Sequence, residues 1–286
     1  MAQALLNGMV SGMLIALAAI ALSLTYGVLN FPNFAIGAMI TTGAYLAYFL
    51  NAQLGLALAV AAPLAAIGLA LISVVVAHAV YRPLRTDDPI ALLLASAGVT
   101  FVLENAVRFI YGAEVRGFDQ PVARPLVWQG LRLNHEQLVD AAVAVAAMIA
   151  VAVILKLTRL GRAMRAISDS PALAQVRGID KGRTIDWTWA LAGALAALSG
   201  VLIGLDGTVE PLIGTNYLIT VFAAAILGGI GNPLGAMAGG LVIGIVEEFS
   251  ALVLPTTYRQ GASFVVLVLV LFVRPQGLAG VARFRR

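Results

Sequence analysis

Apolar residues form long continuous runs along this chain, and short polar segments separate the runs. The runs lack the alternation of polar and apolar residues, over segments of about 10 residues, that is typical of transmembrane β-strands. Runs close to the length of about 20 residues that an α-helix needs to cross the hydrocarbon core predict transmembrane helices instead. They lie at residues 5–29, 34–50, 54–81, 89–111, 138–157, 185–205, 216–230, 234–254 and 262–273.

The fold class that follows is an all-α, polytopic transmembrane helical bundle with about eight or nine membrane segments. We expect a single transmembrane domain over residues 1–286, with the polar segment 159–183 as a loop within it. The runs 34–50, 216–230 and 262–273 are short for helices that cross the membrane completely. The pattern therefore leaves open that one or two segments are discontinuous or re-entrant.

Composition makes a membrane location necessary. Hydrophobic residues make up 61% of the chain and charged residues only 11%, whereas a soluble domain carries about 25% charged residues. Too few polar side chains remain to cover a surface that faces water, so lipid must cover most of it. The absence of cysteine excludes disulfides, thiolate catalysis and cysteine-ligated zinc. The net charge of +4 does not indicate a nucleic-acid partner, because the basic residues cluster at the ends of the apolar runs.

Lysine and arginine are concentrated in three polar regions, which the positive-inside rule places in the cytoplasm. These regions are the loop at Arg82 and Arg85, the segment 159–183 and the C-terminal tail 274–286. Acidic residues balance the basic ones in the loop 112–137, so we expect that loop outside. If every segment crosses, the N-terminus lies outside; if the segment 34–50 only dips into the membrane, the N-terminus lies inside.

Two stretches interrupt the apolar pattern in a similar way. "LTYGVLNFPNFAIGAM" spans residues 24–39 and "AAILGGIGNPLGAMAGG" spans residues 224–240, and each places Gly, Asn and one Pro between apolar segments. Such interruptions in two halves of a transporter predict discontinuous helices that line a translocation path. Ordinary tight turns between closely packed helices are the alternative. Polar residues here either line the path or cap broken helix ends. The candidates are Ser23, Thr25, Tyr26, Asn30, Asn33 and Asn232.

The basic segment 159–183, "RLGRAMRAISDSPALAQVRGIDKGR", predicts two short helices. The first is expected to continue the preceding span, with apolar residues such as Met164 and Ile167 along one side. The second has signals for a defined start and stop. Ser170 suits the N-cap, Pro171 suits the first helical position, and Gly178 suits a left-handed end.

Leu173 and Val176 share one face of this second helix, and no apolar core is available for that face to enter. One interpretation is an amphipathic helix that lies on anionic lipid headgroups. The other is a small apolar surface that inserts into a groove of a cytoplasmic partner. The sharp helix limits favour the second interpretation, because a patch on lipid does not need a defined rod.

A few charged residues lie within predicted spans, where a charge at the membrane centre costs about 2.5–3.5 kcal/mol. Glu104 and Arg108 lie one helical turn apart, acid first, in the favourable order for a helical pair. We expect them to neutralise each other; a path-lining charge that meets a zwitterionic substrate is the alternative. Glu247 adjoins Glu248, and because neighbouring residues point about 100° apart on a helix, at most one of them faces the bundle centre.

Three phrases occur in an order that is typical of one transporter family. "LSLTYGVLNFPNFAIGAM", "GRAMRAISDSPALAQVRGID" and "AAILGGIGNPLGAMAGGLVIGIVEE" resemble the LivH-type permeases, membrane subunits of bacterial ABC importers for branched-chain amino acids. The resemblance covers nearly the whole chain and implies a multi-pass protein of the bacterial plasma (inner) membrane. It also implies that the cytoplasmic loop 159–183 docks onto an ATPase subunit through a coupling helix at residues 170–178. The coupling candidates are Arg162, Arg165, Asp169, Ser170, Pro171, Leu173, Val176 and Gly178.

The resemblance further implies partners: a second related permease in a heterodimer, two ABC ATPase subunits, an extracytoplasmic substrate-binding protein, and membrane lipid. The sequence lacks the G-x-x-x-x-G-K-[ST] loop that cradles nucleotide phosphates, because neither Lys156 nor Lys181 follows a glycine. We therefore expect a transporter subunit that is not itself an enzyme, with no catalytic residues, metal or cofactor. The expected cargo is a branched-chain or other hydrophobic amino acid. The alternatives are an ABC permease for urea, a short amide or a small carboxylate, and an ion-coupled carrier that relies on Glu104 or Glu247.

Overall fold

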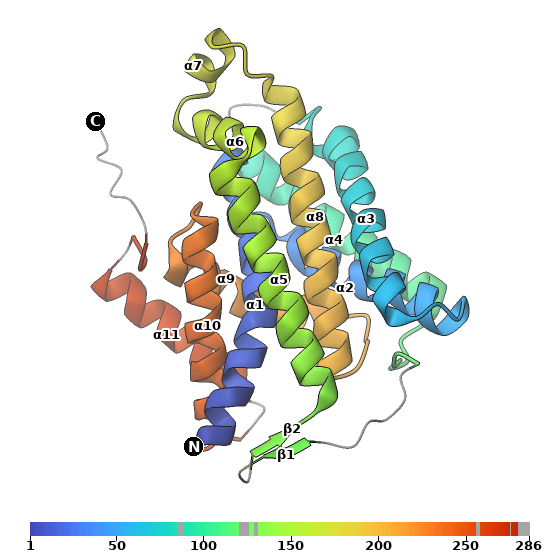
Figure 1. Ribbon diagram of the computed structural model, residues 1–286. Coiled ribbons are helices and arrows are strands. Elements are labelled where there is room, and N and C mark those ends of the chain that lie inside the picture. The colour runs from blue at the N-terminus through green and yellow to red at the C-terminus, as the bar shows by residue number, and fades with distance from the viewer. Residues whose placement is uncertain (85–88, 120–125, 129–130, 256–257, 275, 280–286) are drawn as a thin grey trace.

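The computed structural model describes residues 1–84, 89–119, 126–128, 131–255, 258–274 and 276–279. Long helices form a bundle, two short helices lie at one end of it, and a two-stranded hairpin lies at the other end (Figure 1). The helices are α1 (Ala2–Leu29), α2 (Ala35–Tyr48) with a π-helical turn η1 (Phe49–Gln53), α3 (Leu58–Val76) with a π-helical turn η2 (Ala77–Tyr81), α4 (Pro89–Tyr111), α5 (His135–Leu157), α6 (Arg159–Asp169), α7 (Pro171–Val176), α8 (Lys181–Asp206), α9 (Ile213–Gly228), α10 (Pro233–Ser250) and α11 (Arg259–Val273). The hairpin strands β1 (Leu126–Trp128) and β2 (Leu131–Leu133) pair antiparallel.

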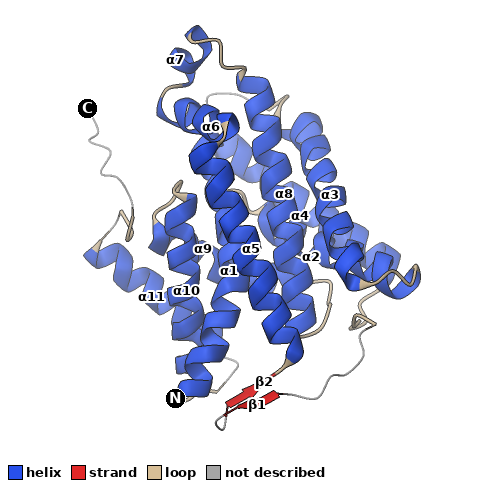
Figure 2. Ribbon diagram, in the orientation of Figure 1, coloured by secondary structure: helices blue, strands red, loops and turns tan. Residues whose placement is uncertain are grey.

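The all-α, polytopic fold predicted from the apolar runs is confirmed, and helix dominates the ribbon in Figure 2. In the described residues, seven helices are long and apolar enough to cross a membrane, and α9 and α11 are shorter apolar helices. The second segment, predicted to be short, gains its π-helical turn and reaches 19 residues over Ala35–Gln53. The sequence pattern does not indicate the hairpin, because each strand has only 3 residues.

The two ends of the bundle carry different features. α6 and α7 project from one end, called here the α7 end, whereas the N-terminus and the β-hairpin lie at the opposite end (Figure 1). The N-terminus and the α7 end are expected at opposite ends of the bundle if the segment 34–50 crosses the membrane. With the segment 159–183 in the cytoplasm, this arrangement places the N-terminus outside. Arg85 and residues 280–286, on which that orientation partly depends, lie outside the described residues.

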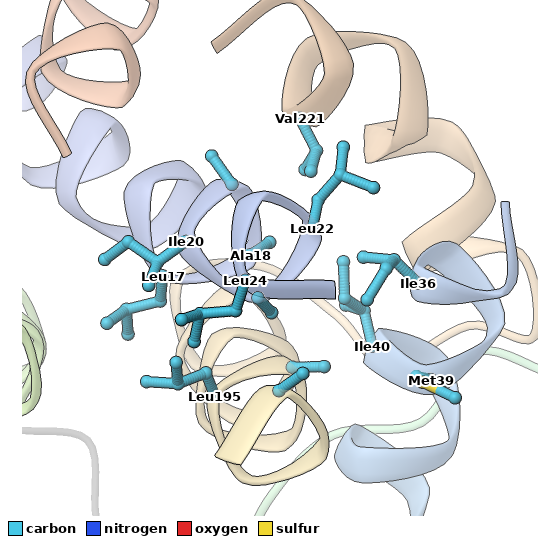
Figure 3. Packing of buried hydrophobic residues seen from close by; sticks show 14 of the residues in the cluster. Leu17, Ala18, Ile20, Leu22, Leu24, Ile36, Met39, Ile40, Leu195 and Val221 are labelled. Atoms are coloured by element: carbon cyan, nitrogen blue, oxygen red, sulfur yellow. The ribbon is translucent and has the colours of Figure 1, made fainter. Parts of the chain in front are cut away.

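α1 and α8 lie at the centre of the bundle. The side chains of α1 from Ile15 to Ala21 are fully buried, and all of them except Ala16 belong to one large apolar cluster with α2, α8 and α9. Figure 3 shows Leu22 of α1 next to Val221 of α9, while Ile36 of α2 lies near the end of α1. By contrast, α3, α4 and α5 leave most of their side chains uncovered by the rest of the chain, as suits helices at a lipid boundary.

Glycines let α1 and α10 approach closely. Gly8 and Gly12 of α1 pack against Gly240 and Gly244 of α10, and each pair has the small-xxx-small spacing that supports helix association in membranes. A Cβ atom on Gly244 would lie 2.3 Å from the Cα atom of Gly12, and one on Gly240 would lie 2.5 Å from the Cα atom of Ala16. Because lipid tails are as apolar as leucine, close backbone packing rather than hydrophobic force holds these two helices together.

Gly244→Ala should destabilise the protein, because the new methyl group has to displace the backbone of α1. Overpacking of this kind costs about 1–3 kcal/mol, which should lower the midpoint of thermal unfolding of the purified protein in detergent. Gly98→Ala is the matched control, since a methyl group on Gly98 would meet no atom outside the adjoining backbone of α4 within 4 Å. We expect an unchanged or slightly higher midpoint for the control; equal midpoints for the two variants would contradict the proposed packing.

Candidate functional site

The first break in the apolar pattern separates α1 from α2. Asn30 ends α1 in the left-handed region, with φ 58° and ψ 34°, and its backbone N–H donates to the Tyr26 carbonyl at 2.8 Å. The side-chain oxygen of Asn33 accepts the backbone N–H of Ala35 at 3.1 Å, which starts α2. The Ser96 hydroxyl of α4 accepts a further backbone N–H of the break at 3.1 Å. Protein groups thus replace the helical bonds lost at the break, as a bilayer requires.

The second break separates α9 from α10. Gly229 and Gly231 have positive φ values of 103° and 82°, a region that residues with a side chain rarely adopt. Asn232 then caps α10, because its side-chain oxygen accepts the backbone N–H of Gly235 at 3.2 Å. The glycines therefore reverse the chain, and the asparagine starts the next helix within one turn.

The C-terminal tail completes the second break. The backbone N–H of Leu278 donates to the Leu227 carbonyl at 2.7 Å, and the N–H of Ala279 donates to the Gly228 carbonyl at 3.2 Å. The side-chain amide of Asn232 in turn donates to the Ala279 carbonyl at 2.9 Å. The last carbonyls of α9, which the helix itself cannot satisfy, are therefore bonded by the tail.

The two breaks lie side by side, although about 200 residues separate them in the sequence. A Cβ atom on Gly27 would lie 3.0 Å from the carbonyl oxygen of Gly231. A cavity of about 30 Å³ lies between the two breaks, with Ser23, Tyr26 and Ile230 among its walls. The Ser23 hydroxyl is fully buried and has no hydrogen-bond partner within the described residues. A water molecule needs about 10–15 Å³, so water is a suitable partner for it.

The polar candidates of the two breaks divide into two groups. Ser23 and Tyr26 line the cavity, and their role in a path stays a prediction. Thr25 instead donates to a carbonyl of its own helix at 2.9 Å. The three asparagines end or begin helices, which is the capping role that the sequence left as the alternative.

Glu104 faces the interior of the bundle, but the expected ion pair with Arg108 does not form among the described residues. Glu104 is 7% exposed and accepts a hydrogen bond from the Thr215 hydroxyl of α9. Arg108 lies on the exposed side of α4. The spacing of one helical turn was suitable for a pair, but α4 packs so that only the first of these side chains points into the bundle.

Glu247 and Glu248 of α10 share one arginine. Glu247 is 3% exposed, and it accepts hydrogen bonds from the Thr220 hydroxyl at 2.7 Å and from the Ser263 hydroxyl. The Nη2 atom of Arg259 lies 2.8 Å from Oε2 of Glu248, and its Nε atom lies 3.9 Å from Oε2 of Glu247. Glu247 is therefore a satisfied residue between helices. In the part of the chain that the structure describes, no group of three or more His, Asp or Glu residues could hold a metal ion.

α6 does not continue α5, contrary to the expectation for the first basic helix. Thr158 is extended, with φ −91° and ψ 163°, and its hydroxyl accepts a backbone N–H of α6 at 3.3 Å to start a new helix. Met164 and Ile167 are buried, as predicted for the apolar side of α6. The Arg165 guanidinium donates to the carbonyl of Leu155 near the end of α5. α6 is thus bent away from the span but tied to it.

α7 is a defined helix of 6 residues at the tip of the α7 end. The Ser170 hydroxyl accepts the backbone N–H of Leu173 at 3.4 Å, Pro171 holds the first position, and Gly178 follows with φ 78°. The start and stop expected from the sequence are therefore present. Leu173 is 67% exposed and Val176 is 86% exposed, so this chain leaves the apolar face of α7 uncovered.

Comparison with known proteins gives this geometry a family. Residues 4–272 match the family described as the branched-chain amino acid transport system / permease component. The chain belongs to this permease family. It is a permease subunit of an ABC importer and a multi-pass protein of the inner membrane.

The permease has well-covered relatives. It is 33% identical, over 97% of its own length and 95% of the relative's, to the high-affinity branched-chain amino acid transport system permease protein LivH of Escherichia coli. It is 32% identical, over the same shares, to the corresponding permease protein BraD of Pseudomonas aeruginosa. A solved structure, PsaBC from Streptococcus pneumoniae in complex with Fab, shares its fold with a TM-score of 0.53 and 13% identity, over 96% of this chain and 92% of that chain.

Two features of the permease were not identified from the sequence. Arg259 stands in the polar stretch before the last apolar run, and only the packing of α11 against α10 brings it to the two glutamates. The tail was interpreted only through its charge, yet Leu278 and Ala279 bond the end of α9. Gly277, with φ 75° and its backbone against α9, was the local signal for a close approach.

Asn232→Ala should lower the stability of the permease, because it removes the cap of α10 and the hydrogen bond to the tail. Loss of such a cap costs about 0.5–2 kcal/mol, to be measured as a lower thermal midpoint in detergent. Asn232→Asp keeps the acceptor and loses only the donor, so its midpoint should lie between those of the wild type and Asn232→Ala. A changed KM for cargo at an unchanged midpoint would show a path residue instead and refute the capping role.

Proposed function

We propose that the permease forms one half of the transmembrane pore of an ABC importer and moves branched-chain or other hydrophobic amino acids into the cell. Separate ATPase subunits dock onto α7 and supply the energy, and this chain hydrolyses no ATP itself. The observation that carries the proposal is the capped helix α7, which holds Leu173 and Val176 exposed beyond the end of the bundle. The branched-chain amino acid systems named for the relatives support the cargo.

The attachment of α7 favours a protein partner over lipid headgroups. Ala174, on the other side of α7, is buried, and α7 contacts α8. α6 is tied to α5 through Arg165. A displacement of α7 is therefore passed to two spanning helices. A helix that merely lies on lipid would not need this mechanical connection. Arg162 and Asp169 are exposed on α6 and add charges beside the apolar face, so the surface has the apolar centre and polar rim of a protein interface.

The proposed assembly contains a second related permease, two ATPase subunits and an extracytoplasmic substrate-binding protein. The missing phosphate-binding loop supports an external source of energy. The cavity of about 30 Å³ between the two breaks is much smaller than an amino acid, which supports a path that opens only when the helices move. The two breaks of this chain form only one wall of such a pore. We assign the opposite wall to the second, related permease, with which this chain forms a heterodimer.

The buried carboxylates support this proposal better than an ion-coupled carrier. Glu104 is bonded to Thr215, and Glu247 is bonded to Thr220 with Arg259 nearby. Neither carboxylate lines the cavity between the breaks. A proton or cation that moved through them would first have to break bonds that hold the helices together.

Leu173→Asp should abolish co-purification of the ATPase subunits with the permease and ATP-driven leucine uptake by the reconstituted importer. The substitution places a charge at the centre of an apolar interface, whereas insertion into the membrane should not change because the side chain lies outside the bundle. Copy number in the membrane fraction and uptake of labelled leucine into proteoliposomes are the two measurements.

Gln175→Asp is the matched control, because it adds the same charge to the same short helix at an exposed polar position. We expect it to retain the ATPase and most of the uptake. Retained co-purification and uptake in Leu173→Asp would refute α7 as the coupling helix. Uptake that excess urea or a short amide suppresses, and that excess isoleucine does not, would refute the proposed cargo.

A further inference from the structure

A cavity of about 190 Å³ opens at the α7 end of the bundle, apart from the small cavity between the breaks. The end of α1, the turn η2 and the beginnings of α4 and α8 surround it. These segments meet at the end of the bundle from which α6 and α7 project (Figure 1). If that end is cytoplasmic, as proposed above, the cavity opens toward the cytoplasm.

The inner wall of this cavity is aromatic and fixed in place. The ring of Tyr81 stacks on that of Trp189, with centroids 4.6 Å apart and planes 18° apart, and the ring of Phe31 lies 5.5 Å from Tyr81. All three side chains are buried, and none of them is more than 3% exposed. Rings packed in this way have little freedom to collapse into the cavity. Because they are themselves almost fully covered, the apolar surface that a ligand can reach belongs to the partly buried Val28 and Leu29 at the end of α1.

The mouth of the same cavity carries charges of both signs. Arg82 and Lys181 line it together with Asp186. The carboxylate of Asp186 also lies 3.7 Å from the Nε2 atom of His78, on the η2 side of the mouth. Two cationic groups and one carboxylate above an apolar wall are complementary to a zwitterion with an apolar side chain, and less so to a simple anion or a neutral solute.

We propose that this cavity is a binding site for the cargo amino acid on the cytoplasmic side of the permease. The α-carboxylate lies toward Arg82 and Lys181, the α-ammonium group toward Asp186, and the apolar side chain against Val28 and Leu29, in front of the aromatic rings. The proposal rests on the proposed function for the identity of the cargo. Affinity is low, because the charged groups at the mouth are partly exposed and water screens them. A weak site of this kind suits release into the cytoplasm.

The cavity is connected to the first break by a hydrogen bond. The Tyr81 hydroxyl donates to the side-chain oxygen of Asn33 at 3.3 Å, and the same oxygen starts α2. Phe31 belongs to the break itself and lines the cavity. A ligand that displaces Tyr81 or Phe31 therefore acts on the group that holds α1 and α2 in their present arrangement. In this proposal the cavity is the last binding site on a translocation path that passes the first break.

Trp189 provides a direct measurement. The chain has 3 tryptophans, so Trp128→Phe with Trp187→Phe leaves Trp189 as the single tryptophan of the purified full-length permease in lipid nanodiscs, where it can be excited selectively over tyrosine. We expect millimolar L-leucine to change this emission saturably. N-acetyl-leucine amide, which has the same side chain and no charge, should produce no saturable change. An absent response to leucine, or an equal response to the blocked compound, would overturn the proposal.

Charge variants test the mouth of the cavity. Lys181→Gln and Asp186→Asn should each raise the apparent Kd for leucine, by up to about fivefold for a partly exposed ion pair. Arg183→Gln is the matched control, because Arg183 stands on the same turn, outside the cavity lining, and pairs with Asp180 at 3.3 Å. An unchanged Kd in both charge variants, or an equal change in Arg183→Gln, would also overturn the proposal.

Leucine uptake by the assembled importer separates this inference from the proposed function. If ATP-driven leucine uptake continues but the Trp189 emission does not respond to leucine, the cavity site is refuted and the proposed function is not. A saturable Trp189 response that the charge variants weaken, in an importer that moves no leucine, supports an amino-acid site and refutes the proposed cargo.

Discussion

A broken helix in a bilayer exposes backbone N–H and C=O groups that lipid cannot satisfy, and this constraint governs the structure of the permease. Each of the two breaks is therefore enclosed by protein groups that replace the missing helical bonds. At the first break these groups are Asn33 and a serine of α4. At the second break they are Asn232 and the C-terminal tail. The two breaks meet where Gly27 approaches Gly231, and Asn30 and Ile230 stay exposed there.

The permease has two kinds of contact with different mechanical roles, the close packing between α1 and α10 and the hydrogen bonds at the two breaks. Gly8 and Gly12 of α1 are in backbone contact with Gly240 and Gly244 of α10, so this pair is suited to move as one unit. The breaks at the ends of these helices are held by a small number of hydrogen bonds. In the coupling proposed above, motion of α7 reaches α5 and α8, both of which contact α1 of this pair. We infer that transport uses this difference between rigid packing and replaceable caps.

The sequence was sufficient for properties that depend on local chemistry. Apolar runs predict the helices because hydrocarbon imposes a length on them, and the capped start and stop of α7 follow from Ser170 and Gly178. Properties that depend on how helices face one another could not be predicted. Helical spacing indicated a pair of Glu104 with a later arginine on α4, whereas packing gave it Thr215.

The same limit explains the other differences. Thr158 can continue a helix or cap a new one, and the apolar pattern on both sides does not distinguish the two. Arg259 has its partners on a different helix. The path candidates were predicted as one group, but only the fold separates Ser23, which lines a cavity, from Asn33 and Asn232, which serve the backbone.

Thiol accessibility gives the most direct test of a path between the two breaks. The chain has no cysteine, so Ser23→Cys introduces a single thiol at the wall of the small cavity. Ser199→Cys is the matched control, because Ser199 is equally buried but bonded to the Leu14 carbonyl at 2.9 Å in the α1–α8 contact. In membranes that contain the assembled importer, we predict that a small hydrophilic thiol reagent labels Ser23→Cys in at least one nucleotide state and never labels Ser199→Cys. Equal protection of both thiols in every nucleotide state would contradict a path at this position.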